Sequence, residues 1–192
     1  NKADKGPDNF WSNIGLSEIE IYGEESDIEA AENKNHVNAA GVTAEASTTE
    51  ASSLPVSNIK DGNNQTRWAS DYSEASKQTV TVTFPKVTLV KELDFDLHTR
   101  DVAPMPSNVK SFDLVYTDAQ GTEHTVKISN AKSTESGKTG YVTDMRHIFE
   151  TPVYMKSFKM TNFDLQIDIE GQNGYNNISI LEVRAYSNDQ SE

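Results

Sequence analysis

The chain has 192 residues, a formal net charge of −13 and no cysteine. This length suits one domain with a sizeable buried core, and the missing cysteines exclude a disulfide framework. The excess of negative charge disfavours binding to nucleic acid or anionic lipid, since both need a basic face, and no apolar run approaches the roughly 20 residues of a membrane span.

The first 35 residues stand apart from the rest. Residues 13–23 align without gaps with residues 177–187, and Asn, Ile, Glu and Tyr are identical at four positions. Two interpretations stay open: residues 1–23 close a preceding sister module, with Phe10 and Trp11 packing them down, or they form a strand of this domain's own sheet. Residues 24–35 indicate an acidic linker. We therefore expect a domain over residues 36–187, a tail over 188–192, and a module excised from a longer protein.

An oxygen-rich turn follows. Asp61, Asn63 and Thr66 place a carboxylate, an amide and a hydroxyl around Gly62. Ca²⁺ binds six to eight oxygens at about 2.3–2.6 Å, and a tight turn can bring such groups together. A polar Asx-type turn between strands explains the same residues equally well. Trp68 comes directly after the turn and is expected in the core.

Short alternating apolar runs fill the remainder, and Gly- or Pro-containing turns separate them. They lie at residues 79–84, 93–97, 112–116, 126–128, 158–160 and 165–169. Short strands without a convincing helix predict an all-β fold, an antiparallel β-sandwich of the jelly-roll kind. In the last strand the apolar phase shifts between Ile180 and Leu181, which predicts a β-bulge that frees the Leu181 carbonyl.

The turn at residues 58–68 and the final strand at 178–186 together resemble the discoidin, or coagulation factor C-type, superfamily. They are most similar to its bacterial carbohydrate-binding branch, family 32, and the family 71 modules of streptococcal β-galactosidases are a further likeness. The resemblance covers roughly residues 36–187 and implies a galactose-binding-domain-like fold with a structural Ca²⁺. Its ligands would be side-chain oxygens of Asp61, Asn63, Thr66 and Glu182 and backbone carbonyls of Asn58 and Leu181.

The same resemblance implies a sugar site in the loops at one end of the sandwich, with an aromatic ring to stack on the sugar and charged groups for its hydroxyls. The candidates are Tyr175, Arg100, Asn108, His98, Tyr72 and Asn176. Alternatives remain: Tyr175 closes the sandwich end, Arg100 forms a surface salt bridge, or His98 lies on a solvated face. Many galactose-binding relatives keep a His directly after the motif Trp, and this chain has Ala69 there, which puts the identity of the sugar in doubt.

These features predict a non-catalytic carbohydrate-binding module. We expect a monomeric module that targets a larger secreted or cell-wall-anchored bacterial glycosidase to glycans with terminal galactose, such as galactose, lactose or N-acetyllactosamine. The alternative is a discoidin-like adhesion domain that binds a host protein, with residues 102–106 as an apolar spike. No nucleophile–base pair or catalytic zinc motif points to an enzyme.

Overall fold

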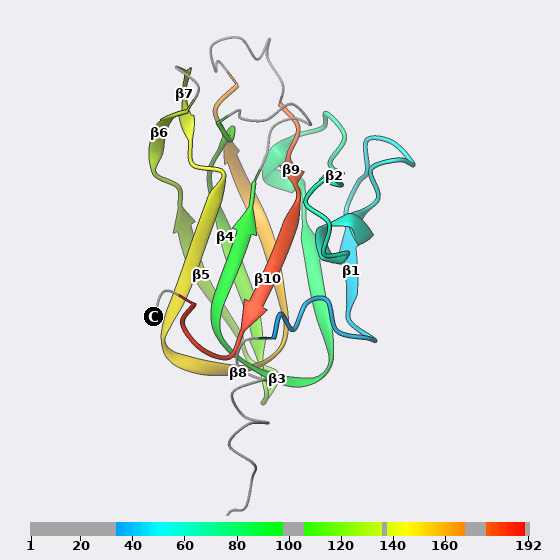
Figure 1. Ribbon diagram of the computed structural model, residues 1–192, viewed down its shortest axis with the longest axis vertical. Coiled ribbons are helices and arrows are strands. Elements are labelled where there is room, and N and C mark those ends of the chain that lie inside the picture. Colours follow the sequence, from blue (N-terminus) through cyan, green and yellow to red (C-terminus); the bar gives the residue numbers. More distant parts are fainter. Residues whose placement is uncertain (1–33, 98–105, 136–137, 168–175, 191–192) are drawn as a thin grey trace, which may run out of the picture.

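A computed structural model describes residues 34–97, 106–135, 138–167 and 176–190. Ten strands and two single-turn 3-10 helices make up this part of the chain (Figure 1). In order they are β1 (Thr43–Ala46), η1 (Val56–Lys60), β2 (Trp68–Ala69), η2 (Ala75–Lys77), β3 (Val80–Asp96), β4 (Val109–Asp118), β5 (Glu123–Ser129), β6 (Lys132–Glu135), β7 (Lys138–Tyr141), β8 (Asp144–Leu165), β9 (Ser179–Ile180) and β10 (Glu182–Tyr186).

The strands form an antiparallel β-sandwich, as predicted. The main sheet runs β1-β3-β8-β4-β5, with β10 also paired to β3. One layer contains the first half of β3 and the second half of β8, together with β1, β4 and β5. β10 pairs with residues 92–96 of β3, in the other half of that strand. The long strands β3 and β8 therefore bend from one layer into the other, and Figure 1 shows β10 in the front layer.

The bends coincide with breaks in the β3–β8 register. The pairing shifts between Thr83 and Thr88 and again between Val90 and Glu92. Pro85 lies in the first gap, and Pro152 lies in the part of β8 that faces the second gap. Proline cannot donate to a ladder hydrogen bond, so these positions suit a corner where the strands separate.

Aromatic side chains join the two layers across the core. Phe95 of the front layer meets Phe112 of β4 edge to face at a centroid distance of 5.1 Å, and Phe112 in turn meets Phe163 at 5.5 Å. Phe95 and Phe112 are fully buried. Such contacts explain why the alternating runs at 93–97 and 112–116 face inward.

One predicted run is wrong. β8 ends at Leu165, and the side chain of Ile167 is 56% exposed, so the alternation at residues 165–169 does not continue the strand inward. Ile169 lies outside the described residues. The predicted phase shift is confirmed: Ile180 and Leu181 are both buried, and Leu181 interrupts the strand between β9 and β10.

The two ends of the described chain meet at one end of the sandwich. The backbone N–H of His36 donates to the carbonyl of Ala185 at 2.8 Å, and the His36 ring lies 2.7 Å from the Ser187 hydroxyl. The side chain of Asn35 accepts a hydrogen bond from the Ala185 N–H at 3.1 Å. Residues 1–23, which the sequence assigns either to a sister module or to a strand of this sheet, lie outside the described residues.

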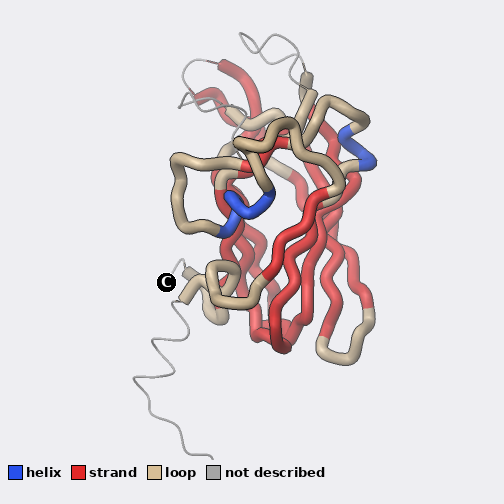
Figure 2. Tube along the Cα trace, turned by 90° about the vertical axis from the view of Figure 1, so that its right-hand side faces the viewer, coloured by secondary structure: helices blue, strands red, loops and turns tan. Residues whose placement is uncertain are grey.

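The helices lie among the loops beside the sheets (Figure 2). They contain five and three residues. Among the described residues, no helix has the length and apolar character needed to cross a bilayer.

Candidate functional site

The oxygen-rich turn begins where η1 ends. Ile59 in η1 is fully buried and attaches the turn to the core, and Asp61 closes the helix. Gly62 follows with a φ of +75°, and a Cβ there would lie 3.1 Å from Asn38 Nδ2. Only glycine adopts this backbone conformation without strain, so its place in the motif has a physical reason.

Side chains of the turn bind its own backbone. Asp61 Oδ1 accepts a hydrogen bond from the Asn63 N–H at 2.8 Å, and Asp61 Oδ2 accepts one from the Thr66 hydroxyl at 2.7 Å. Asn58 lies one turn earlier and donates from Nδ2 to the Arg67 carbonyl at 2.8 Å. An Asx-type turn is thus present, and it brings the carboxylate and the hydroxyl of the motif together, whereas the Asn63 side-chain oxygen accepts a hydrogen bond from the Gln65 N–H at 3.0 Å.

Glu182 adds a second carboxylate from the far end of the chain. Its side chain is buried at the start of β10, and Oε1 accepts a hydrogen bond from the Asn63 N–H at 2.9 Å. Oε2 is also buried and has no hydrogen-bond partner among the described residues. Burial, followed by the hydrogen bond to the neighbouring Asp61 carboxyl that forms only when one of the two carboxyls is protonated, raises the pKa of Glu182 to about 7. Two carboxyls held together without a cation favour a shared proton.

The donor set matches the needs of a hard divalent cation. It offers only oxygens, a combined charge of −2 when Asp61 and Glu182 are ionised, and one buried oxygen that lacks a donor. Asn63 and Thr66 lie in the same cluster. Leu181 precedes Glu182 and anchors it, since its N–H donates to the Asp96 carbonyl at 2.8 Å. The carbonyl of Asn58 accepts a long hydrogen bond of 3.5 Å from the Asp61 N–H.

Trp68 belongs to the core, as predicted. It is fully buried, its Nε1 donates to the Thr48 carbonyl at 3.1 Å, and β2 pairs it with Ile180 of β9. The neighbouring Ala69 is also fully buried. The turn is therefore fixed to the last strand from both sides, by Trp68 at one end and by Glu182 at the other.

The structure describes only some of the residues that the sequence predicts to contact the sugar. His98, Arg100 and Tyr175 lie outside the described residues. Asn108 is buried, and its Nδ2 donates to the Asn177 carbonyl at 3.0 Å, which fixes the chain just before β9. Asn176 is exposed beside it.

Tyr72 is linked to the same region through a residue that the sequence did not single out. Its ring is 48% exposed, and its hydroxyl lies 3.1 Å from Glu50 Oε1. The other oxygen of Glu50 accepts a hydrogen bond from Asn177 Nδ2 at 3.0 Å. Glu50 therefore bridges Tyr72 and the segment that leads into β9. No periodicity or motif marks Glu50, because its role depends on contacts distant in sequence.

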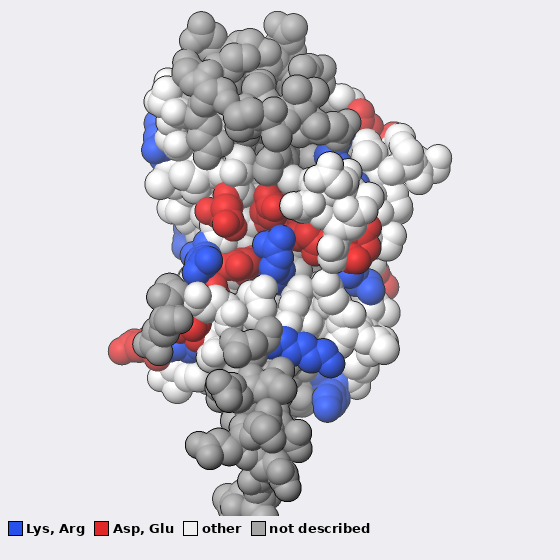
Figure 3. Space-filling view, viewed as in Figure 1, with Lys and Arg blue, Asp and Glu red and all other residues white. Residues whose placement is uncertain are grey.

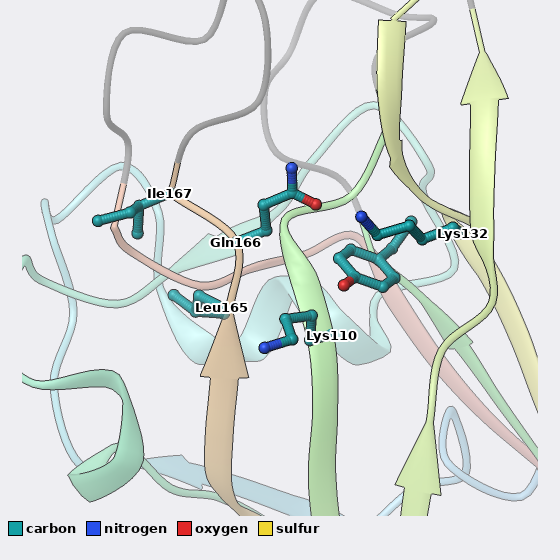
Figure 4. Close-up of a pocket in the computed structure, with 6 residues that line it drawn as sticks. Lys110, Lys132, Leu165, Gln166 and Ile167 are labelled. Atoms are coloured by element: carbon teal, nitrogen blue, oxygen red, sulfur yellow. The ribbon is translucent and has the colours of Figure 1, made fainter.

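A pocket of about 300 Å³ opens near the start of β4 (Figure 4). Lys132 lies on one side of it, with its ammonium 5.8 Å from the centroid of the Tyr141 ring, and Gln166 and Ile167 lie on the other. Lys110 at its base pairs with Asp164 at 2.9 Å. The buried Gln166 Oε1 has no hydrogen-bond partner among the described residues. No sequence pattern reveals this pocket, because β4, β6, β7 and β8 all contribute to it.

The described residues next to the remaining candidates lie at one end of the sandwich. Asp96, the last residue of β3, pairs with Glu182, the first residue of β10. The chain after Asp96 leads to His98 and Arg100, and the chain before Glu182 comes from Tyr175 and Asn176. In an antiparallel pair these two segments leave at the same end of the sheet. This end is opposite to the one where His36 and Ala185 meet.

Comparison with known proteins agrees with this architecture. The F5/8 type C domain model matches residues 43–183. The family 32 carbohydrate-binding module of C. perfringens NanJ, solved in complex with galactose, has 20% identity and a TM-score of 0.57, and the match covers 76% of this chain and 93% of that chain. A second C. perfringens module, CpGH89CBM32-5 in complex with GalNAc-β-1,3-galactose, has 14% identity and a TM-score of 0.56, with 80% of this chain and 99% of that one covered.

A chitosan-binding module from a Paenibacillus sp. IK-5 chitosanase/glucanase is also similar, at 20% identity and a TM-score of 0.51 over 80% of this chain and 99% of that one. No protein among the curated sequences matches. The structural likenesses establish the fold, and the family model covers most of the chain. The resemblance inferred from the turn and the last strand is thus confirmed, and the chain belongs to the F5/8 type C, or discoidin, domain family.

Proposed function

We propose that this chain is a non-catalytic carbohydrate-binding module. The pairing of Asp96 with Glu182 supports the proposal, because the described segments that lead toward Arg100 and away from Tyr175 leave the sheet at the same end. Tyr72 and Asn176 are exposed, and Asn108 lies buried beneath Asn177. Similar folds bind galactose in the NanJ module and GalNAc-β-1,3-galactose in CpGH89CBM32-5.

The ligand we propose is a glycan with terminal galactose, such as galactose, lactose or N-acetyllactosamine. A galactose ring presents C–H groups on one face, which suit a Tyr ring, and hydroxyls that suit the fork of an Arg. Tyr175 would supply the ring and Arg100 the fork, while Tyr72 and Asn176 extend the site. His98 would border it, and Asn108 would support it from below. Because the side chain of Ala69 cannot form a hydrogen bond, these groups would bind the axial hydroxyl of galactose.

A structural Ca²⁺ belongs to the same proposal. Asp61, Asn63, Thr66 and Glu182 would hold it with side-chain oxygens, and Asn58 and Leu181 with carbonyls. The buried, unpartnered Glu182 Oε2 supports this assignment, as does the closeness of two carboxyls. The ion would neutralise their charges and connect the turn to β10. It would not touch the sugar.

In this proposal the module works as a tethered part of a larger secreted or cell-wall-anchored bacterial glycosidase. One module would bind as a monomer with a Kd on the order of 0.1–1 mM, and attachment to an enzyme or to sister modules would raise the effective affinity. The family relatives include modules taken from glycoside hydrolases, such as a family 31 enzyme of Clostridium perfringens.

A glycan array in the presence of Ca²⁺ tests the proposal directly. Signal confined to terminal galactosides and lost in the Tyr175→Ala/Arg100→Ala variant would support it. Tyr154→Ala/Lys156→Ala is the matched control, because Tyr154 is 60% exposed at the opposite end of the sandwich. A blank array from a folded, Ca²⁺-loaded chain would contradict glycan binding and favour the adhesion alternative.

A further inference from the structure

A second groove lies at the other end of the sandwich, where the described chain begins. Its volume is about 550 Å³. The bend of β3 supplies its apolar floor, with Phe84, Pro85, Val87 and Leu89. The side chain of Val87 is 40% exposed.

The rim of this groove is basic although the chain as a whole is acidic. Lys34, His36 and Lys86 line it, and none of its lining residues is Asp or Glu. Burial, followed by the charges of Lys34 and Lys86, lowers the pKa of His36 below its ordinary value. Figure 3 shows basic side chains without acidic neighbours at the lower right of the described surface. The groove is thus a local positive site on a chain of net charge −13.

The segment that directly precedes Lys34 has the complementary chemistry. Residues 24–32 read Glu-Glu-Ser-Asp-Ile-Glu-Ala-Ala-Glu and contain five carboxylates. Within it Ile28 stands between Asp27 and Glu29, so one apolar side chain is flanked by two negative charges. The groove offers the inverse arrangement, an apolar floor between Lys34 and Lys86.

Chain connectivity adds to this complementarity. Because Lys34 lines the groove, the acidic segment is attached at the rim, and only five residues stand between Ile28 and Lys34. A tether this short keeps the segment at a high effective concentration, commonly in the millimolar range, so a weak site suffices to hold it. A free anionic ligand would have to compete with it.

We propose that residues 24–32 dock in this groove, with Ile28 on the floor and Asp27 and Glu29 facing Lys34 and Lys86. The docked segment would fix the direction in which residues 1–23 leave the sandwich. It would lie at the end opposite to the proposed glycan site, so that its loss would alter orientation without altering glycan recognition.

The absence of cysteine makes a crosslinking test clean. The variant Ile28→Cys/Val87→Cys is equilibrated with a glutathione redox buffer, and the fraction of intramolecular disulfide gives the effective concentration of the two thiols. We expect this value to fall about tenfold or more when Lys34→Glu/Lys86→Glu is added, and to fall in high salt. Lys77→Glu/Lys127→Glu gives the same net charge elsewhere and should leave it unchanged. Equal values in both charge variants would overturn the proposal.

Alkylation of a single Val87→Cys thiol by iodoacetamide provides an independent measurement. Docking protects the thiol, so Asp27→Asn/Glu29→Gln should raise the rate several-fold. Thermal unfolding of each variant verifies that the sandwich stays folded. If a heparin-derived oligosaccharide protects the thiol while Asp27→Asn/Glu29→Gln leaves its rate unchanged, the groove takes an external anionic sugar and the proposal is wrong.

Discussion

Buried carboxyls are the most informative single residues of this chain. The buried Glu182 lies beside the exposed Asp61 at the turn, and the buried Glu92 and Asp94 lie together on the outer face of the front layer. Arg146 Nε is 3.6 Å from both Glu92 and Asp94, and Figure 3 shows acidic and basic side chains side by side across this face. In the part of the chain that the structure describes, Glu182 forms no ion pair, since the nearby Arg184 pairs with Asp96 at 4.0 Å, whereas Arg146 reaches both carboxyls of the second pair. We therefore assign only the first to a cation.

The Ca²⁺ proposal predicts opposite effects of Glu182→Gln in the two metal states. In excess Ca²⁺, at about 100 times the Kd, the wild type gains about 2.7 kcal/mol, which raises Tm by roughly 5–10 °C, and the variant loses most of that gain. In chelator the variant is at least as stable as the wild type, because the substitution removes the like-charge contact of the buried Glu182 with Asp61.

Thermal unfolding with EDTA and with CaCl₂ gives both values. Glu123→Gln, at an exposed position on β5, is the control and should respond to Ca²⁺ as the wild type does. A wild type whose Tm is the same in EDTA and CaCl₂ would contradict the metal site.

Asp94 predicts a pH dependence that does not involve the metal. Burial, followed by hydrogen bonding to Glu92, raises the pKa of Asp94 to about 7 from an ordinary value of 3.8. The folded chain thus binds this proton more tightly than the unfolded chain, so the stabilisation is complete below about pH 4 and is lost as pH rises to about 7. Asp94→Asn removes this loss. The free energy of unfolding of the variant relative to wild type should rise by about 1–2 kcal/mol between pH 5 and pH 8 in EDTA.

Urea unfolding at the two pH values measures this difference, and Asp118→Asn serves as a control of opposite sign. A hydrogen bond from His124 lowers the pKa of Asp118, so its ionised form favours the folded chain. Removing that carboxylate should therefore lower stability above pH 4. A constant difference between Asp94→Asn and wild type from pH 5 to pH 8 would refute the assignment.

At the scale of elements, η1 holds the turn in register with the last strand. Ile59 is fully buried, and truncating such a side chain costs about 2–4 kcal/mol. Ile59→Ala should therefore lower the free energy of unfolding by that amount and weaken Ca²⁺ binding, because the helix leads directly into Asp61. Urea titration and Ca²⁺ titration check the two effects. Ile148→Ala, at a 39% exposed position, should lower the free energy of unfolding far less. An Ile59→Ala variant with unchanged Ca²⁺ affinity would show that η1 does not position the Ca²⁺ ligands.

Elements differ in how far the sequence predicts them. Alternation found β3 and β4 because one face of each strand is buried and the other is not. The same pattern cannot reveal β2 or β9, which have two residues each and exist through their mutual pairing. β8 was found only in its second half, since Pro152 interrupts the pattern at the bend.

The residues of the candidate site also differ in how far the sequence predicts them. Asp61, Asn63 and Thr66 could be read from their spacing, because the turn brings neighbours in sequence together. Glu182 required the family resemblance, since it meets the turn from over 100 residues away. Glu50 and the pocket beside Tyr141 depend on contacts across the fold and had no sequence signal.

At the scale of the whole molecule, the two ends of the sandwich carry different chemistry. The basic groove lies where His36 meets Ala185, and the proposed glycan loops lie beyond Asp96 at the other end. Lys34→Glu/Lys86→Glu should therefore leave the Kd for a galactoside within about twofold, as expected for sites that share no contacts. Isothermal titration calorimetry with lactose measures this Kd. A several-fold change would contradict the prediction and show that the two ends of the sandwich are energetically coupled.

The meeting of His36 with Ala185 also determines how the molecule would bear mechanical load. A force that separates residues 34 and 190 pulls on two segments at the same end of the sandwich, so it opens their hydrogen bonds one after another instead of shearing them together. Once these have opened, the load reaches β10 at Tyr186 and peels it from β3 toward Glu182. The proposed Ca²⁺ site would then act as a clamp at the last point that the peeling front reaches.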